Sequence, residues 1–196
     1  MLSNRFTEAL IYATQLHADQ VRKGSGVPYI AHLLGVASIA LEYGANEDEA
    51  MPTASASPYA ALLHDGIEDR GGAATREEIR RRFGDRVTAI VDGCTDAETT
   101  PKPPWRQRKE AYIAHIPTAS PSVVLVSAAD KLHNARSILH DYRVLGESVW
   151  QCFKGGKEGS LWYYRAVLEA LRQTGYSPLL INELERVVLE VEHLAS

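Results

Sequence analysis

Three short polar segments in apolar surroundings carry side chains that could bind a metal ion. His32 ends PYIAH, His64 and Asp65 are adjacent in LLHDGIED, and Asp130 stands in AADKLHNAR. Two imidazoles and two carboxylates suit a first-row divalent cation such as Mn²⁺, Fe²⁺ or Zn²⁺ and leave coordination positions for water. Because charged groups are not left in apolar surroundings unless they are paired or bind metal, the three segments together predict one divalent-metal site.

Each of these ligands also has a structural interpretation. His32 could be a hydrogen-bonded core histidine, and Asp130 could be a buried cap or an ion-pair partner of Lys131 or Arg136. The coincidence of three such segments favours the metal site. A cation bound there would acidify a water molecule and make it nucleophilic near neutral pH.

Two acids extend the candidate site. If LLHDGIED is helical, Glu68 follows His64 by four residues and Asp69 follows Asp65 by four, so both acids share the ligand face. They could orient the attacking water or accept its proton. The alternative is that they are surface acids that pair with Arg70.

The third segment has the same spacing. Asn134 follows Asp130 by four residues, so its amide is expected in the same cleft, whereas Lys131 and His133 are expected to face elsewhere. We find no GxSxG, Walker-type loop or GxGxxG where another chemistry would need it. A metal-activated water among acids and cations suits hydrolysis of a phosphate ester or anhydride.

The charge pattern suggests a small anionic substrate. A formal net charge of −4 argues against a general nucleic-acid binder. Basic residues nevertheless gather near the ligand segments: Arg22, Lys23, Lys102, Arg106, Arg108 and Lys109. Such local charge would attract a polyanion, with Lys102 and Arg108 as phosphate contacts. The alternative for residues 102–109 is a salt-bridged helix face.

Length and composition indicate one domain, residues 1–196, because 45% hydrophobic residues suffice for a single core. We find no apolar run near the ~20 residues of a membrane span and no signal-peptide pattern, so a cytoplasmic protein is expected. Cys94 and Cys152 are expected to be reduced. The sequence is compatible with a homo-oligomer but does not set an oligomeric state.

Helical periodicity runs along the chain without hairpin-type alternation, which predicts an all-α fold. Ser3 is expected to cap a first helix, and a second runs from Ile30 to Gly44. Thr75 with Glu78 fits a capping box for the helix that ends before Gly84.

Two serine-proline pairs, at 120–121 and 177–178, place a cap residue before a proline at the first helical position. The first should make the β-branched run before Asp130 helical. The second opens an amphipathic C-terminal helix, 177–195, that could complete the core or form a dimer contact. Residues 51–59 are expected to form an exposed insertion, and 99–105 a stiff loop carrying Lys102.

Taken in order, Gln20-x-Arg22-Lys23 with PYIAH, then LLHDGIED, then AADKLHNAR resemble the hydrolase domain of RelA/SpoT-type proteins within the HD-domain superfamily. The resemblance covers about residues 5–175 and is greatest to the stand-alone small alarmone hydrolases. It implies a compact helical HD-domain fold with Mn²⁺ in a central cleft, bound by His32, His64, Asp65 and Asp130. It also implies hydrolysis of the 3′-diphosphate of guanosine tetra- or pentaphosphate (ppGpp or pppGpp) to GDP or GTP and pyrophosphate.

The resemblance assigns further roles: the attacking water to Glu68 and Asp69, the nucleotide to Arg22 and Lys23, and the nucleoside side to Asn134. One departure is GSGV before PYI, a residue longer than the usual family spacing; another is Gly66, where threonine is common. Two rival functions stay open. One is an HD-type phosphohydrolase acting on another nucleotide, such as the 2′-phosphate of NADPH, and the other is a non-catalytic nucleotide-binding module.

Overall fold

Helices account for the regular structure in the described part of the chain. The computed structural model describes residues 2–46, 57–97 and 101–196. Within these ranges the β-structure is limited to an isolated antiparallel bridge between Val21 and Pro28. The expected all-α fold is therefore confirmed. Among the same residues, none of the helices is long and apolar enough to span a membrane.

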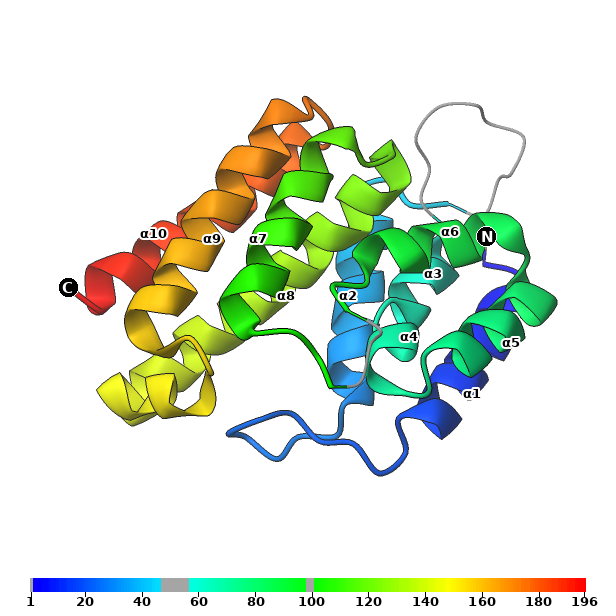
Figure 1. Ribbon diagram of the computed structural model, residues 1–196, viewed down its shortest axis with the longest axis horizontal. Coiled ribbons are helices and arrows are strands. Elements are labelled where there is room, and N and C mark those ends of the chain that lie inside the picture. The colour runs from blue at the N-terminus through cyan, green and yellow to red at the C-terminus, as the bar shows by residue number, and fades with distance from the viewer. Residues whose placement is uncertain (1, 47–56, 98–100) are drawn as a thin grey trace.

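The helices are arranged around two central members (Figure 1). Their bounds are α1 (Asn4–Leu16), α2 (Ile30–Glu42), α3 (Pro58–Leu63), α4 (Gly66–Asp69), α5 (Ala73–Phe83), α6 (Asp85–Cys94), α7 (Trp105–His115), α8 (Pro121–Leu145), α9 (Gly156–Gln173) and α10 (Pro178–Leu194), with 3₁₀ helices η1 (Ile116–Thr118) and η2 (Gly146–Cys152). Helices α1 and α3–α6 lie on one side and α7, α9 and α10 on the other, with α2 and α8 between them.

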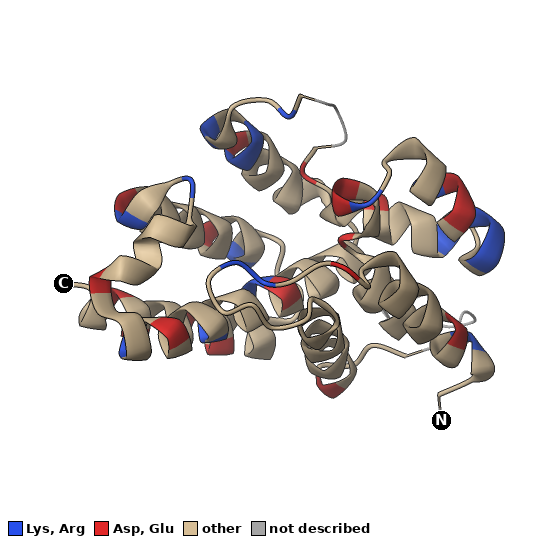
Figure 2. Ribbon diagram, turned by 90° about the horizontal axis from the view of Figure 1, so that it is seen from below, with Lys and Arg blue, Asp and Glu red and all other residues tan. Residues whose placement is uncertain are grey.

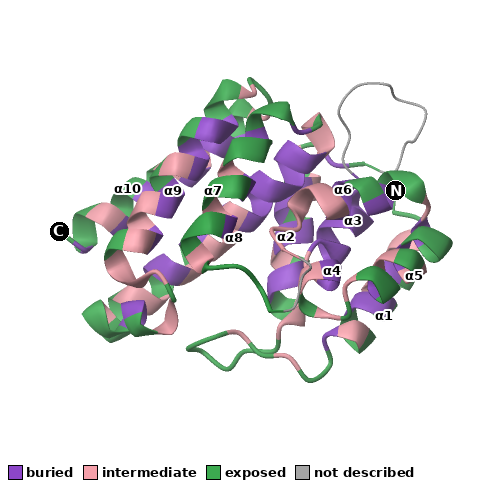
Figure 3. Cartoon of the chain, in the orientation of Figure 1, coloured by how far each residue is buried: buried purple, intermediate pink, exposed green. Residues whose placement is uncertain are grey.

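The core is centred on α2, α3 and α8, where Figure 3 shows the buried positions concentrated. Every residue of α3 is buried, and so is the continuous stretch of α8 from Val123 to Asp130. The β-branched run in α8 is helical, as expected, because surrounding helices cover it on all sides and tertiary packing outweighs propensity. Asp130 therefore stands at the end of a rigid, fully packed segment.

The segment that carries His64 and Asp65 is not one continuous helix. Helix α3 ends at Leu63 and α4 begins at Gly66, so the two candidate ligands occupy the junction. The amide of Asp69 still donates to the carbonyl of Asp65 at 3.0 Å, which preserves one helical turn after the ligands. Side chains pack tightly against Gly66, since an added Cβ would lie 3.1 Å from Leu16 Cδ2.

Two of the predicted helix caps are confirmed. The Ser3 hydroxyl accepts from the amide of Arg5 at 3.1 Å at the start of α1. The Ser120 hydroxyl accepts from the amide of Val123 at 3.4 Å at the start of α8. Each satisfies one of the amides that a helix start leaves without an intrahelical partner.

Two other caps were predicted wrongly. Helix α5 begins after Gly72, and Thr75 lies inside its first turn, where its hydroxyl donates to the carbonyl of Arg70. Ser177 precedes α10 but has a left-handed backbone, with φ of 51°, and makes no side-chain cap bond. Gly84 ends α5 with φ of 86°, as predicted.

The predicted insertion at 51–59 lies mostly outside the described residues. Its last members are described, and the prediction of exposure is wrong for them, because Pro58 and Tyr59 begin α3 and are buried. The loop expected at 99–105 is described from residue 101, and Trp105 already begins α7.

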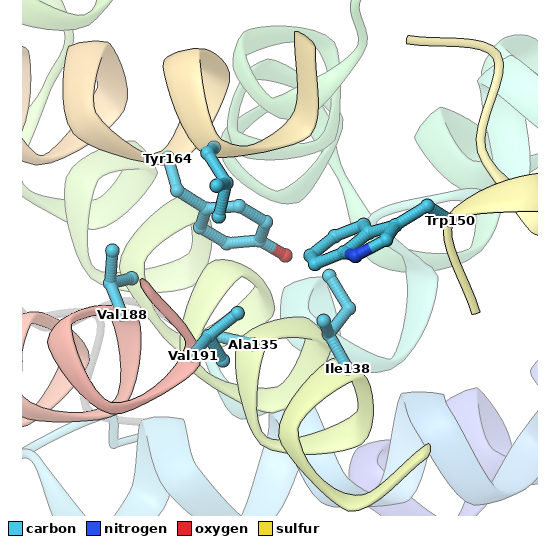
Figure 4. Close-up of a pocket in the computed structure, with 7 residues that line it drawn as sticks. Ala135, Ile138, Trp150, Tyr164, Val188 and Val191 are labelled. Atoms are coloured by element: carbon cyan, nitrogen blue, oxygen red, sulfur yellow. The ribbon is translucent and has the colours of Figure 1, made fainter. Parts of the chain in front are cut away.

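Helix α10 completes the core, packing on α8 and α9. Its apolar side chains close a small hollow in which Tyr164 of α9 and Trp150 of η2 face one another above Ile138 of α8 (Figure 4). The hollow holds only about 10 Å³, the space of a single water molecule. It is a packing feature and no ligand site.

Candidate metal centre and surrounding cleft

The side chains from the three ligand segments meet at one point between α2, the α3–α4 junction and α8. His32 Nε2 lies 3.2 Å from Asp130 Oδ1 and 3.4 Å from Asp65 Oδ2. His64 Nε2 lies 3.1 Å from Asp65 Oδ2 and 3.6 Å from Asp130 Oδ1. The ligand atoms of His32, His64 and Asp130 all lie within 4.8 Å of one another, close enough for one ion.

The donor set at this point fits a cation. His64 Nδ1 lies 2.8 Å from the carbonyl of Ala61, so Nδ1 carries a hydrogen, and in the neutral ring that binds a metal ion the lone pair is on Nε2. That Nε2 is buried without a hydrogen-bond partner and faces the oxygens of Asp65 and Asp130. Lone pairs that converge in this way repel one another unless positive charge lies between them, so the residues fit a divalent metal ion.

Asp65 is also held by a neighbour outside this group. The Tyr29 hydroxyl donates to Asp65 Oδ2 at 2.6 Å, which orients the carboxylate toward the histidines. Tyr29 in turn stacks on His17, with ring centroids 5.2 Å apart. His17, which follows α1, and Tyr29, which precedes α2, thus reinforce the geometry of a candidate ligand.

His64, Asp65 and Asp130 shift one another's pKa values. Burial raises the carboxyl pKa values of Asp65 and Asp130, yet His64 and, for Asp130, the adjacent Lys131 outweigh it and hold them well below the ordinary range. Burial lowers the pKa of His64, but Asp65 and Asp130 outweigh it and hold that pKa well above its ordinary value. Both carboxylates are therefore in the anionic form that binds a cation.

Glu68 and Asp69 line the same cleft as Asp65 and Asp130. Glu68 Oε1 accepts from Lys102 Nζ at 2.9 Å, and Asp69 Oδ2 accepts from the Gln20 amide at 2.8 Å. Burial and the nearby charge of Asp96 raise the pKa of Glu68, although Lys102 opposes this shift. The predicted alternative, in which these acids pair with Arg70, is wrong, because Arg70 bonds instead to Gln20 and Asp19.

Asp96 is a residue of the cleft that the sequence analysis missed. Its side chain is 3% exposed and pairs with Arg108 Nη1 at 2.5 Å and with Lys109 Nζ at 2.6 Å. Although burial raises the pKa of Asp96, Lys109 and Arg108 outweigh it and lower the pKa. A single aspartate in the polar stretch GCTDAETT gives no local signal, because its partners come from α7.

The centre opens into a cleft of about 450 Å³, large enough for a nucleotide. The predicted substrate contacts all line it: Arg22, Lys23, Lys102, Arg108 and Asn134. Arg22 Nη2 donates to Asn134 Oδ1 at 2.9 Å, so the loop before α2 is tied to α8 across the cleft. Asn134 Nδ2 donates to Asp130 Oδ1 at 2.5 Å, which joins this pair to the centre.

The remaining basic residues divide by position. Lys109 and Lys154 line the cleft, whereas Arg106 pairs with Glu110 and lies over the ring of Trp162. Figure 2 shows Lys and Arg interspersed with Asp and Glu over the helices. Arg106 therefore belongs to a salt-bridged helix face, which was the alternative expected for residues 102–109.

The expectation that Lys131 and His133 face away from the site is wrong. Lys131 Nζ lies 2.5 Å from Asp130 Oδ2 and 5.0 Å from the ring centroid of Tyr112. His133 Nδ1 lies 2.9 Å from His32 Nδ1. The side chains of Lys131 and His133 are long enough to reach groups beside their own helix face. Residue spacing along α8 therefore did not exclude either contact.

Comparison with known proteins shows which family the chain resembles. The HD domain family matches residues 9–159. The guanosine-3′,5′-bis(diphosphate) 3′-pyrophosphohydrolase MESH1 of Xenopus tropicalis is 41% identical over 132 residues, covering 67% of this chain and 68% of that protein. The Homo sapiens protein of the same name is 39% identical over 132 residues, with the same coverage.

A solved structure also resembles this chain. It is that of a metazoan ortholog of SpoT that hydrolyses ppGpp, and it superposes with a TM-score of 0.74 and 26% identity over 95% of this chain and 96% of that one. The family match includes the three ligand segments and spans well over half of the sequence. This chain therefore belongs to the HD domain family.

Proposed function

We propose that this protein is a divalent-metal-dependent hydrolase that removes the 3′-diphosphate of ppGpp or pppGpp, releasing pyrophosphate and GDP or GTP. The observation that carries the proposal is the convergence of buried His32, His64 and Asp130 at the base of a cleft lined by cations. Two relatives that are 39% and 41% identical to this chain are guanosine-3′,5′-bis(diphosphate) 3′-pyrophosphohydrolases, which supports the same substrate.

His32, His64 and Asp130 would hold the metal ion, with Asp65 as the fourth ligand. We take the ion to be Mn²⁺, since mixed imidazole and carboxylate ligands suit it. A divalent cation held there supplies Lewis-acid charge to the phosphate and acidifies a bound water. Tyr29 and Ala61 fix the orientations of Asp65 and His64 through the hydrogen bonds described above.

Glu68 is suited to accept the proton of the attacking water. A general base works best when its pKa lies near the working pH, and burial raises that of Glu68. Asp69, held by Gln20, would orient the same water. The reaction adds the water oxygen to the phosphorus of the leaving diphosphate, breaks the bond from that phosphorus to the 3′ oxygen, and leaves a proton on the 3′ oxygen.

The cations of the cleft would bind the phosphates. Lys102 and Arg108 stand beside Glu68, with Nζ and Nη1 at 2.9 and 3.9 Å from Oε1, so they lie next to the reacting group. Arg22 and Lys23 line the cleft from the loop before α2, and Asn134 of α8 would offer an amide to the nucleoside. Charges already in place around a developing anion stabilise it without reorganisation.

The test is release of pyrophosphate from ppGpp by metal-stripped protein, with and without added Mn²⁺. We expect Mn²⁺-dependent release that Asp65→Ala reduces by more than about 100-fold, exceeding the loss typical of outer partners of a metal site. Asp85→Ala is the matched control, because Asp85 is an exposed surface acid whose loss should leave turnover unchanged.

The same assay separates the rival activities. A 2′-phosphatase acting on NADPH would release orthophosphate, so both products are measured with both substrates. Folded, Mn²⁺-loaded protein that released orthophosphate from NADPH but no pyrophosphate from ppGpp would contradict the proposed substrate. Binding of ppGpp without any turnover would instead indicate a nucleotide-binding module.

A further inference from the structure

The contact between His32 and His133 points to a role outside the predicted site. We propose that His133 is a positioning residue of the metal centre: its Nδ1 accepts the Nδ1 hydrogen of His32 and so fixes the tautomer and ring angle of that ligand. The inference rests on the metal site of the proposed function, but not on the identity of its substrate.

Tautomer assignment follows from the neighbours of His32. Its Nε2 faces Asp130 Oδ1 at 3.2 Å and Asp65 Oδ2 at 3.4 Å, the direction in which a metal-binding nitrogen must present its lone pair. The hydrogen of a neutral His32 is then on Nδ1. Because the two Nδ1 atoms lie 2.9 Å apart and share one hydrogen, His133 Nδ1 is the acceptor.

Ring packing fixes the orientation of His32 on several sides. Its ring makes edge-type contacts with His133, His64 and Tyr29, with centroid distances of 4.8, 5.3 and 5.4 Å. His32 is only 1% exposed, so in the folded chain its N–H is shielded from bulk water. Leaving its buried N–H unsatisfied would cost about 1–3 kcal/mol.

An independent feature of α2 accommodates His133. Gly35 stands three residues after His32, and a Cβ added there would lie 2.2 Å from Cδ2 and 2.3 Å from Nε2 of the His133 ring. Real Cβ atoms do not come so close, so any larger residue would displace the ring. Glycine inside a helix costs about 0.5–1 kcal/mol relative to alanine, and here it makes room for the His133 ring beside His32.

The experiment measures Mn²⁺ affinity directly, by titration calorimetry on metal-stripped protein, together with urea unfolding of the metal-free form. We expect His133→Ala to weaken Mn²⁺ binding by about 10–100-fold, as is typical when an outer partner of a ligand is lost. His133→Asn should recover most of the affinity, since its Oδ1 can replace the accepting nitrogen. His140→Ala, an exposed histidine on the same helix, is the matched control.

Substitution of Gly35 gives a second, independent test of the same proposal. Gly35→Ala alone should weaken Mn²⁺ binding as much as His133→Ala, because it displaces the ring. In the His133→Ala background the same substitution should add no further loss. If Gly35→Ala does not fold, the Mn²⁺ affinities of His133→Ala and His133→Asn are sufficient to test the proposal.

Two results would overturn the assignment. One is a set of His133 variants that lose unfolding stability but bind Mn²⁺ within about threefold of the parent chain, which would make His133 a packing residue. The other is an asparagine variant as weak as the alanine variant. Neither depends on turnover, so an absence of ppGpp hydrolysis would contradict the proposed substrate and leave this inference standing.

Discussion

Two neighbouring carboxylates in the cleft have opposite ionisation behaviour. Burial and the charge of Asp96 raise the pKa of Glu68, whereas Lys109 and Arg108 lower the pKa of Asp96 in spite of its burial. Acid and base roles are commonly divided between groups whose environments separate their pKa values in this way. Asp96 thus acts as a permanent anion that keeps Glu68 ready to take up a proton.

This difference predicts the pH dependence of turnover. Glu68 can accept a proton only when ionised, so kcat should fall as pH drops through its pKa, which lies above that of an ordinary glutamate. Lys102 lowers this pKa, and Lys102→Gln should therefore move the acidic limb of the kcat profile upward, by about one pH unit. The profile is recorded at saturating ppGpp, so that weaker binding does not enter.

Lys157→Gln is the control for that experiment, because Lys157 pairs with Glu147 outside the cleft. Its profile should match that of the parent chain. A Lys102→Gln limb that stayed in place or moved to lower pH would show that Glu68 is not the group that titrates in turnover.

Sequence spacing predicted the candidate ligands but not all of their neighbours. His32, His64 and Asp130 could be predicted because each is a polar residue at the edge of an apolar stretch. Lys131 and His133 could not, because their direction depends on groups of other elements. Lys131 lies over Tyr112 of α7, and the His133 ring lies against Gly35 of α2, where only glycine leaves room.

At the scale of elements, the same serine-proline pair precedes two helices but adopts a different conformation at each. Ser120-Pro121 and Ser177-Pro178 both open helices, yet Ser120 caps α8 with its hydroxyl while Ser177 is held in a left-handed conformation. The preceding chain differs: residues 174–177 link α9 to α10, whereas only residues 119–120 separate η1 from α8. The helix starts could be predicted from sequence because proline fixes them, whereas the backbone before them could not.

The two serines should therefore respond differently to substitution. Ser120→Ala should lower the free energy of unfolding by about 1 kcal/mol, the usual loss for a side-chain cap. Ser177→Gly should raise it by about 0.5–1 kcal/mol, because glycine adopts the left-handed region without strain. Urea unfolding of the metal-free chain measures both. Equal losses at the two positions would show that Ser177 also caps its helix.

At the scale of the whole molecule, the metal centre joins parts of the chain that are distant in sequence. Its proposed ligands come from α2, from the α3–α4 junction and from α8, the elements around which the other helices pack. In the unfolded chain these groups are separated, with no preformed site. Binding free energy at the centre is therefore also folding free energy.

Mn²⁺ should accordingly stabilise the folded chain. At a free concentration 100 times the dissociation constant, a ligand that binds only the folded state adds about 2.7 kcal/mol to the free energy of unfolding. For a chain of this size that corresponds to a rise in Tm of roughly 5–10 °C. Calorimetric melting of metal-stripped protein with and without Mn²⁺ measures the shift.

His64→Gln should abolish this shift, because the ligand nitrogen at the centre is lost, whereas Asp85→Asn on the exposed surface should keep it in full. Comparing each variant with and without metal removes any effect of the substitution on the metal-free fold. The urea midpoint should rise with Mn²⁺ while the slope of the transition stays constant, since the surface exposed on unfolding does not change. A His64→Gln chain stabilised as much as the parent would place the stabilising ion elsewhere on the protein.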